Sequence, residues 1–460
     1  MDETELQQRL TRLAERTAPP PRAGLAEAVV ARHRRQRRQA VGVAALAAAV
    51  AAVVVAVPVL TGGTPDQPVA ATAGVDQGSG SADVLAGPVR GSLAADAAFL
   101  EAVRRLPWTS PDFSGGVPAA PVDTRRVVFA GDVAGGRWAL VTGELRSSAD
   151  PGDVAIAWFA GPPGATPEEM RLDSVPYGVD PDLPLARADG STGALLVLTA
   201  PGDTVEVSAR PDVAADGSVR RGYEPVDAPD GVAVTTLAAP PGSWPSAVRY
   251  RVERAGATVT ASTPDGVANG SLQLPDLAVD WLRGQPTPAD DPMVRSALAE
   301  VLGQTGLSAG DVTATGLWIG AVPGPHDRPA RVALLAVTLP SGAVYLTAPV
   351  DWTAADGSGS SGSCGTSVEP AGVPLEQRAL AVRCDVYDGS PESATGGSSL
   401  VVLAPGADTA RVVDMTGVAL ADVPLTDGST VVPAPERAAA VEVSGRDERL
   451  RLLSSADLGG

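Results

Sequence analysis

The sequence predicts a mainly β (α+β) protein in which one transmembrane helix is followed by two related antiparallel β-sandwich-like modules, each preceded by a helix. Three observations predict this architecture. Residues 40–60 form a run without a charged or strongly polar side chain. Beyond this run, short segments alternate apolar and polar residues between Gly, Pro and Asp turns, as strands do. The order of one helix and several strands then occurs twice.

Residues 1–39 are expected to form a cytoplasmic helical arm. Leu6, Leu10 and Leu13 are spaced to share one face of a short helix, which the proline run at 19–21 ends. The arm carries nine Arg against five Asp and Glu, a balance of +4. Since the whole chain has a net charge of −19, everything after the arm carries −23.

Residues 40–60 are expected to form a transmembrane helix. At about 1.5 Å per residue the run is roughly 31 Å long, which matches the hydrocarbon core of a bilayer. A cleaved signal peptide is the main alternative. Such a peptide has a short basic segment and an apolar core of about 7 to 15 residues, whereas this run is longer and follows a long arm.

Basic residues flank this run on one side only, and they predict its orientation. Because cytoplasmic flanks are enriched in Lys and Arg, the N-terminus is expected in the cytoplasm and the C-terminal region outside the plasma membrane. The lipid bilayer is therefore the expected partner, and an acidic exterior argues against nucleic acid, whose phosphates need clustered basic residues. The orienting arginines are Arg32, Arg34, Arg35, Arg37 and Arg38.

The region beyond the span divides into three parts. Residues 61–91 are rich in Gly, Ser, Pro and Ala, and they predict a flexible linker. Extracytoplasmic β-rich module 1 is expected at 92–286 and module 2 at 287–460. Module 2 is expected to be an internal repeat of module 1, because corresponding segments lie about 190 to 205 residues apart.

Each module is expected to begin with a helix. Residues 92–108 are amphipathic with Ser92 as the cap, and residues 290–307 repeat the pattern with Asp291 as the cap. Residues 125–145 then alternate as a hairpin about a Gly turn.

Later segments also correspond, since 193–219 matches 398–431 and 247–262 matches 438–454 in a strand, turn, strand order. Short alternating strands favour antiparallel sandwiches. A β-propeller is the alternative, because segments within 126–161 could be successive strands of one blade. A period of about 200 residues is, however, much longer than a blade of about 40 to 50.

The two cysteines, Cys364 and Cys384, are expected to form a disulfide, because both lie on the exterior side of the span. Such a bridge closes a loop of about 20 residues and contributes on the order of 3 kcal/mol. The Gly- and Ser-rich segment around Cys364 is expected to be a loop that the disulfide holds in place.

No cofactor, metal or catalytic site is identified. A zinc site lacks ligands, because there is no other cysteine and His326 is the sole exterior histidine. His326 lies in a Pro/Gly turn, and no G-x-S-x-G motif occurs. Residues 212–217 contain Asp and Gly without the calcium-loop pattern, and a β-turn is expected there. Trp108 and Trp244, which neighbour prolines, are candidates for a binding surface.

The absence of lysine excludes several chemistries. A phosphate-binding GxxxxGK[ST] loop, a Schiff-base lysine and a Ser-x-x-Lys nucleophile all need a residue that the chain does not contain. Carboxylate catalysis stays open, because 54 Asp and Glu offer many pairs.

The first 60 residues resemble actinobacterial single-pass membrane proteins, including transmembrane anti-sigma factors. The likeness lies in a short Leu/Arg helix, a Pro run, an Arg cluster and an Ala/Val span. It implies an alternative function as a transmembrane regulator acting through residues 4–39. The zinc motif His-x-x-x-Cys-x-x-Cys of that family is absent, since the arm has His33 and no cysteine.

The expected function is therefore that of a bitopic membrane protein. Its tandem extracytoplasmic β-modules would bind or sense a ligand or protein partner at the cell envelope. A carboxylate-based hydrolase of envelope polymers is the second alternative to this function, after the anti-sigma-type regulator.

Overall fold

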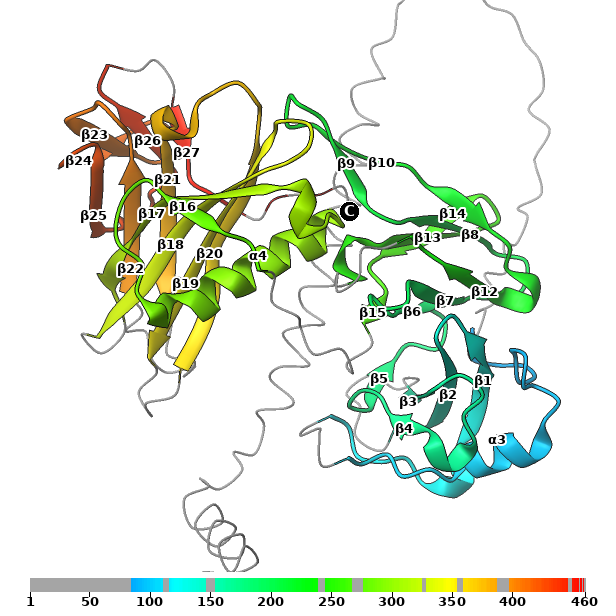
Figure 1. Cartoon of the computed structure of the whole chain (residues 1–460). Coiled ribbons are helices and arrows are strands. Elements are labelled where there is room, and N and C mark those ends of the chain that lie inside the picture. Colours follow the sequence, from blue (N-terminus) through cyan, green and yellow to red (C-terminus); the bar gives the residue numbers. More distant parts are fainter. Residues whose placement is uncertain are drawn as a thin grey trace, which may run out of the picture. The chain divides into compact units, whose positions relative to one another are not determined.

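The protein is mainly β, as predicted. The computed structural model (Figure 1) describes residues 84–110, 116–145, 154–238, 245–266, 276–324, 328–353, 359–386, 397–445, 449–454, 456 and 458. Over these residues the strands form several sheets in which almost all neighbours are antiparallel, and none of the sheets closes into a barrel. We call residues 84–266 the first half and residues 276–458 the second half.

The first half contains one α-helix and three main sheets. The helix is α3 (Ala97–Arg104). The first sheet contains β1 (Arg126–Val133), β2 (Gly136–Glu144) and β3 (Val154–Gly161), with the short edge strands β4 (Arg171–Leu172) and β5 (Tyr177–Val179). The second sheet has the order β12 (Val232–Thr236), β7 (Ala194–Leu198), β6 (Leu185–Ala188) and β15 (Asp265–Gly266). The third has the order β11 (Glu224–Val226), β8 (Thr204–Ser208), β13 (Arg249–Arg254) and β14 (Ala257–Ser262), and β9 (Pro211–Val213) and β10 (Val219–Arg221) form a separate hairpin.

The second half is built in the same sequence of elements. Its helix is α4 (Asp291–Thr305). The first sheet has the order β16 (Val279–Trp281), β17 (Thr313–Pro323), β18 (Pro329–Thr338), β19 (Val344–Thr353) and β20 (Gly359–Glu369). The second has the order β21 (Leu380–Val386), β22 (Gly397–Leu403) and β25 (Ser429–Pro433). The third has the order β24 (Ala419–Pro424), β23 (Thr409–Val413), β26 (Ala440–Val443) and β27 (Arg449–Arg451).

Corresponding sheets of the two halves have the same strand order. The order β12-β7-β6 corresponds to β25-β22-β21, and β11-β8-β13-β14 corresponds to β24-β23-β26-β27. In each first sheet a short segment also pairs in parallel with the first long strand: Arg90 pairs with β1, and β16 pairs with β17. The two halves are therefore alike in how their strands are connected as well as in the order of their elements.

Two glycines before the helices show the likeness at the level of single residues. Gly91 and Gly284 each follow an arginine and have positive φ values of 102° and 82°. A Cβ on Gly91 would lie 2.3 Å from the carbonyl oxygen of Ala130 in β1, and one on Gly284 would lie 2.2 Å from that of Ile319 in β17. Both positions therefore require glycine, for the same reason and against the same strand of each half.

The turns that enter β12 and β25 repeat a rarer backbone conformation. Asp230 and Asp427 have φ values of 54° and 51°, a region that few residues other than glycine adopt. Each is followed by a glycine, Gly231 or Gly428, with φ values of 75° and 70°. The carbonyl oxygens of these glycines accept a hydrogen bond from the first residue after β7 and β22, respectively.

Both helices differ from the sequence prediction at their N-termini. Asp96 caps α3 by accepting from the backbone N–H of Phe99 at 3.0 Å, so the prediction of Ser92 as the cap is wrong. The Ser92 hydroxyl instead accepts from the N–H of Asp132 at 2.9 Å and joins the segment before α3 to β1. The residue before α4 is Asp290, one position earlier than the predicted cap, and its side chain is occupied elsewhere.

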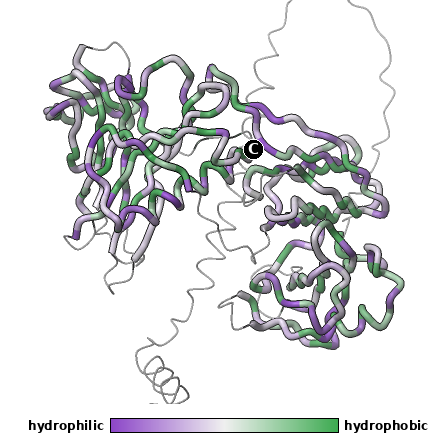
Figure 2. Tube along the Cα trace, in the orientation of Figure 1, coloured by the Kyte–Doolittle hydropathy of each residue, from purple (hydrophilic) through white to green (hydrophobic). Residues whose placement is uncertain are grey.

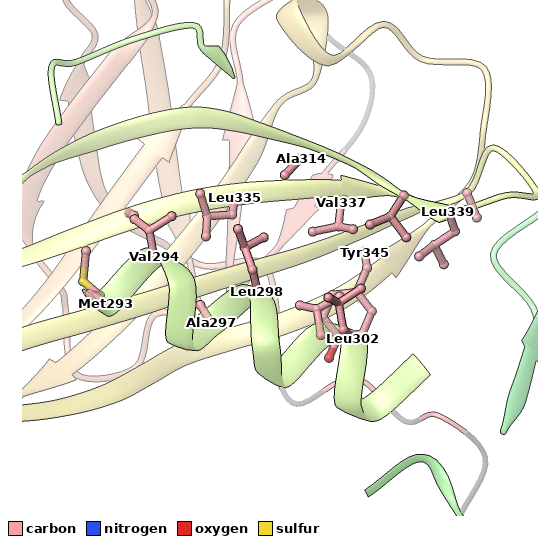
Figure 3. Packing of buried hydrophobic residues seen from close by; sticks show 14 of the residues in the cluster. Met293, Val294, Ala297, Leu298, Leu302, Ala314, Leu335, Val337, Leu339 and Tyr345 are labelled. Carbon is pink, nitrogen blue, oxygen red and sulfur yellow. The ribbon is translucent and has the colours of Figure 1, made fainter. Parts of the chain in front are cut away.

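The helix α4 covers one face of the first sheet of the second half. Figure 3 shows Val294, Leu298 and Leu302 pointing from the helix toward Leu335 and Tyr345 on β18 and β19. Hydrophobic stretches follow the strands in both halves (Figure 2), as the alternating pattern predicts. Apolar burial of this kind is the main source of stability in each half.

The end of the predicted linker belongs to the folded first half. Val84 and Leu85 are buried against β1, β2 and β3, and Arg90 is also buried. Arg90 donates to the carbonyl oxygen of Thr199 at 3.0 Å. The structure therefore differs from the boundary at residue 92, because apolar side chains within 61–91 find a core to enter.

Candidate functional site

Cys364 and Cys384 form the predicted disulfide, with a Cα–Cα distance of 4.6 Å. It joins β20, at the edge of the first sheet of the second half, to β21 in the second sheet. Cys384 is fully buried and Cys364 is half-buried. The disulfide therefore lies at the junction of two sheets, where it restrains both.

The backbone explains how the bridge reaches β21. In the β19–β20 ladder, Ser363 pairs with Pro349 and Thr366 pairs with Thr347, so Cys364 and its neighbour form a bulge. Proline cannot donate a ladder hydrogen bond, and a bulge bends a strand and redirects its side chains. The segment predicted as a loop is thus an edge strand, because backbone pairing does not depend on its small side chains.

A buried ion pair occupies the junction between the first two sheets of the first half. Asp173, which follows β4, pairs with Arg187 of β6, and both side chains are almost completely removed from solvent. The Arg187 guanidinium carbon lies 5.2 Å from the ring centre of Trp158 in β3. Burial lowers the pKa of Arg187 to about 10, so the side chain stays charged at neutral pH.

A second carboxylate approaches this pair from β15. Asp265 lies opposite Arg187 in the parallel pairing of β15 with β6, and it accepts a hydrogen bond from the hydroxyl of Tyr177 in β5. The cluster therefore connects β3, β4, β5, β6 and β15. A buried charge that is paired and hydrogen-bonded holds a junction in one arrangement, and its removal from solvent does not favour contact with a ligand.

Asp290 and Asp351 form a third cluster around Arg331, at the start of α4. Asp290 accepts from the Nε and Nη2 of Arg331, each at 2.9 Å, and these bonds are the main cause that lowers its pKa to about 2. Burial raises the pKa of Asp351, which lies opposite Arg331 in the β18–β19 ladder, and the Asp290 charge adds to this rise. Because Arg331 neutralises Asp290, the cluster serves to fix α4 on the sheet.

Among the residues that the structure describes, no group of three or more His, Cys, Asp or Glu side chains is arranged to hold a metal ion. The Asp-containing segment 212–217 forms the turn between β9 and β10, in which the N–H of Gly217 donates to the carbonyl oxygen of Ala214 at 2.9 Å. It is a β-turn, as predicted.

Trp108 does not lie on the surface, so the alternative that it belongs to a binding surface is wrong. Its side chain is buried, and the Arg125 guanidinium carbon lies 4.8 Å from its ring centre. Arg125 in turn donates to the carbonyl oxygens of Ala120 and Leu106 at 2.9 and 2.7 Å, which folds the segment after α3 over the ring. A proline neighbour therefore does not distinguish an exposed tryptophan from a covered one.

Several sequence predictions fall outside the described residues. They are the cytoplasmic arm, the span at 40–60, Trp244, His326 and the orienting arginines Arg32, Arg34, Arg35, Arg37 and Arg38. Within the ranges given above, no helix is both long enough and apolar enough to cross a bilayer.

No family model matches the sequence, and no curated protein matches it. The functional conclusions therefore rest on the sequence and on the geometry described above.

Proposed function

We propose that the protein is a single-pass membrane protein that displays two related β-sandwich-like modules on the outer side of the plasma membrane. The modules bind a ligand or protein partner at the cell envelope. The apolar run at 40–60 anchors the chain, and the arginines before it keep the N-terminus in the cytoplasm.

The observation that carries this proposal is the Cys364–Cys384 disulfide. Structural disulfides form and persist in oxidising spaces and are rare in the cytosol. The bridge joins two sheets, so it belongs to the folded module and is not an incidental surface pair. Its compartment is therefore the compartment of the module, which agrees with the orientation that the arginine flank predicts.

The likeness between the halves supports a display function. The shared strand orders and the two glycine positions favour duplication of one module, and a duplicated module offers two related surfaces on one anchor. Linked modules bind a repetitive target more tightly than one module does, because the second binding step is intramolecular. A repetitive envelope polymer or a membrane protein array is the kind of target that rewards this arrangement.

Thiol labelling on intact spheroplasts tests the compartment. Cys364 is half-buried, so a membrane-impermeant maleimide is expected to label it only after an impermeant reductant has opened the disulfide. Labelling that needs no reductant, or that needs lysis of the membrane, would contradict the proposal. A Cys364→Ala/Cys384→Ala chain is the control for background labelling.

Binding is tested by co-sedimentation of the purified full chain with isolated cell walls. The proposal expects the chain to sediment with the walls in a saturable manner and a chain cut after the first half to bind at least tenfold more weakly. A chain that stays in solution at every wall concentration would exclude the wall polymer as the target.

A further inference from the structure

The two halves contact each other through the β9–β10 hairpin of the first half. Val213 and Val219 of this hairpin pack against the apolar cluster under α4. The N–H of Ala371 donates to the carbonyl oxygen of Ala215 at 2.8 Å, and the Nε of Arg221 donates to the carbonyl oxygen of Leu458 at 2.9 Å. The connection between β8 and β11 is therefore one of the elements by which the first half docks on the second, together with the short helix Pro245–Ala247, which lies against the end of α4.

The corresponding connection of the second half is the turn between β23 and β24. This turn carries Met415 and Val418, which are 90% and 55% exposed and are the two most exposed large apolar side chains of the described chain. Within the described part of the chain, the turn that corresponds to the docking hairpin thus has its two large apolar side chains exposed.

The turn is held in one shape. The Asp414 carboxylate accepts from the N–H and hydroxyl of Thr416 at 2.9 and 2.7 Å and from the N–H of Val418 at 3.0 Å. Arg437 adds an ion pair to Asp414 at 3.6 Å. A turn whose backbone is fixed in advance loses little conformational entropy when its apolar side chains enter a partner.

The first half also has an exposed apolar residue, at a position that corresponds to part of the surface on which the hairpin docks in the second half. We call this place, the short helix before the first long strand of a half, the receiving position. In the second half, Ala309 of the short helix Ala309–Asp311, which leads into β17, packs against the same apolar cluster as Val213 and Val219 of the hairpin. The short helix Val122–Thr124 leads into β1 in the same way, and Val122 is 43% exposed. Among the residues that the structure describes, none therefore covers the Val122 side chain completely.

The charged residues near the exposed turn of the second half and near Val122 of the first half have the same signs as those at the contact between the halves. Arg210, which precedes β9, is among the groups that lower the pKa of Asp311 in the receiving helix. At the free ends, Arg437 lies beside the turn of the second half, and Asp123 follows Val122 in the first. Arg437 and Asp123 thus carry opposite charges, as Arg210 and Asp311 do at the contact between the halves.

From these observations we propose that two copies of the chain associate head to tail. The β23–β24 turn of one copy, with Met415 and Val418, docks on the Val122–Thr124 helix of a second copy. The contact repeats outside the chain the one that the β9–β10 hairpin makes within it. Repeat proteins that remain single usually end in polar capping surfaces, whereas Met415, Val418 and Val122 are exposed apolar side chains at these two positions. The proposal rests on the likeness of the halves and is independent of the envelope ligand.

Sedimentation of the purified full chain in density-matched detergent tests the proposal. The mass of the wild-type chain is expected to rise with concentration. Met415→Asp and Val122→Asp are each expected to weaken association at least tenfold, because either change puts a charge into the contact. Val234→Asp is the matched control, because Val234 is 43% exposed but lies on β12, away from both ends, and association should be unchanged.

A mixture of the two variants distinguishes a head-to-tail contact from a symmetric one. The Met415→Asp copy keeps an intact receiving helix, and the Val122→Asp copy keeps an intact turn, so the mixture should form dimers that do not grow further. A wild-type chain that stays monomeric at all concentrations would overturn the proposal. So would undiminished association of either variant, or a mixture that stays monomeric although the wild type associates.

Discussion

The two halves fasten the same pair of sheets by different chemistry. In the first half, Asp173 beside edge strand β4 pairs with Arg187 of β6, and in the second half Cys364 of edge strand β20 bonds to Cys384 of β21. The strands β6 and β21 hold the same place in their sheets. A likeness in connectivity thus does not carry with it a likeness in the interactions that stabilise the junction.

The difference changes what each junction depends on. The ion pair depends on both partners staying charged and on exclusion of water around them. The disulfide depends on an oxidising compartment, and its reduction would remove a covalent link between the sheets without leaving a charge among its apolar neighbours. The first junction is therefore sensitive to substitution, and the second is sensitive to the redox environment.

The largest effect is expected from breaking the buried ion pair. Asp173→Asn leaves the Arg187 charge without a partner in a dry junction, which typically costs about 3 to 5 kcal/mol. Urea unfolding followed by tryptophan fluorescence measures this loss, and Trp158 beside Arg187 reports on it directly. Asp173→Leu combined with Arg187→Met should recover most of the stability. A single variant as stable as the wild type would show that the pair does not hold the junction.

Removal of the disulfide is expected to have the next largest effect. Cys364→Ala/Cys384→Ala should lower the free energy of unfolding by about 3 kcal/mol, because the bridge closes a loop of about 20 residues. Hydrogen exchange by mass spectrometry should show faster exchange in β20 and β21 and unchanged exchange in β6 and β7. Equal acceleration in both halves would contradict separate fastening of the two junctions.

Acid should weaken the attachment of α4 in the second half. Asp290 has a folded pKa of about 2 against an ordinary value of 3.8, so its contribution is complete above pH 4 and is lost as the pH falls through 3.8 toward 2. The loss is about 2 kcal/mol. Asp290→Asn should remove this part of the pH dependence of unfolding. The same acid-induced loss in the variant would assign it to other carboxylates.

The smallest effect concerns a partly buried pair whose signs are reversed between the halves. Glu206 of β8 lies opposite Arg251 of β13, whereas Arg411 of β23 lies opposite Glu442 of β26. Glu206→Arg combined with Arg251→Glu gives the first half the polarity of the second. Because the pair keeps its opposite signs and solvent still screens part of its attraction, the urea midpoint should change only slightly, chiefly through the loss of the Arg251 contact with the Tyr223 ring. A clear loss of stability would mean that the sign matters for a neighbour.

The sequence predicted most of the strands where apolar and polar residues alternate, but not the Gly- and Ser-rich strand β20 and not the contacts between sheets. Alternation predicted the hairpin of β1 and β2, and the two cysteines predicted their own pairing. Asp173 and Arg187 gave no signal, because they lie in separate segments and only the packing of two sheets brings them together. Ser92 was predicted as a cap by its residue type, but Asp96 lies nearer the first turn and takes that role.

The protease accessibility of spheroplasts, together with the mass of the mature N-terminus, tests the proposed function most directly. The account predicts that added protease digests the chain beyond about residue 60 while the membrane is intact, and that an N-terminal fragment containing residues 1–39 and the span is protected. It also predicts a mature chain that begins near residue 1. A mature N-terminus after residue 60, or digestion of the modules only after lysis, would contradict it.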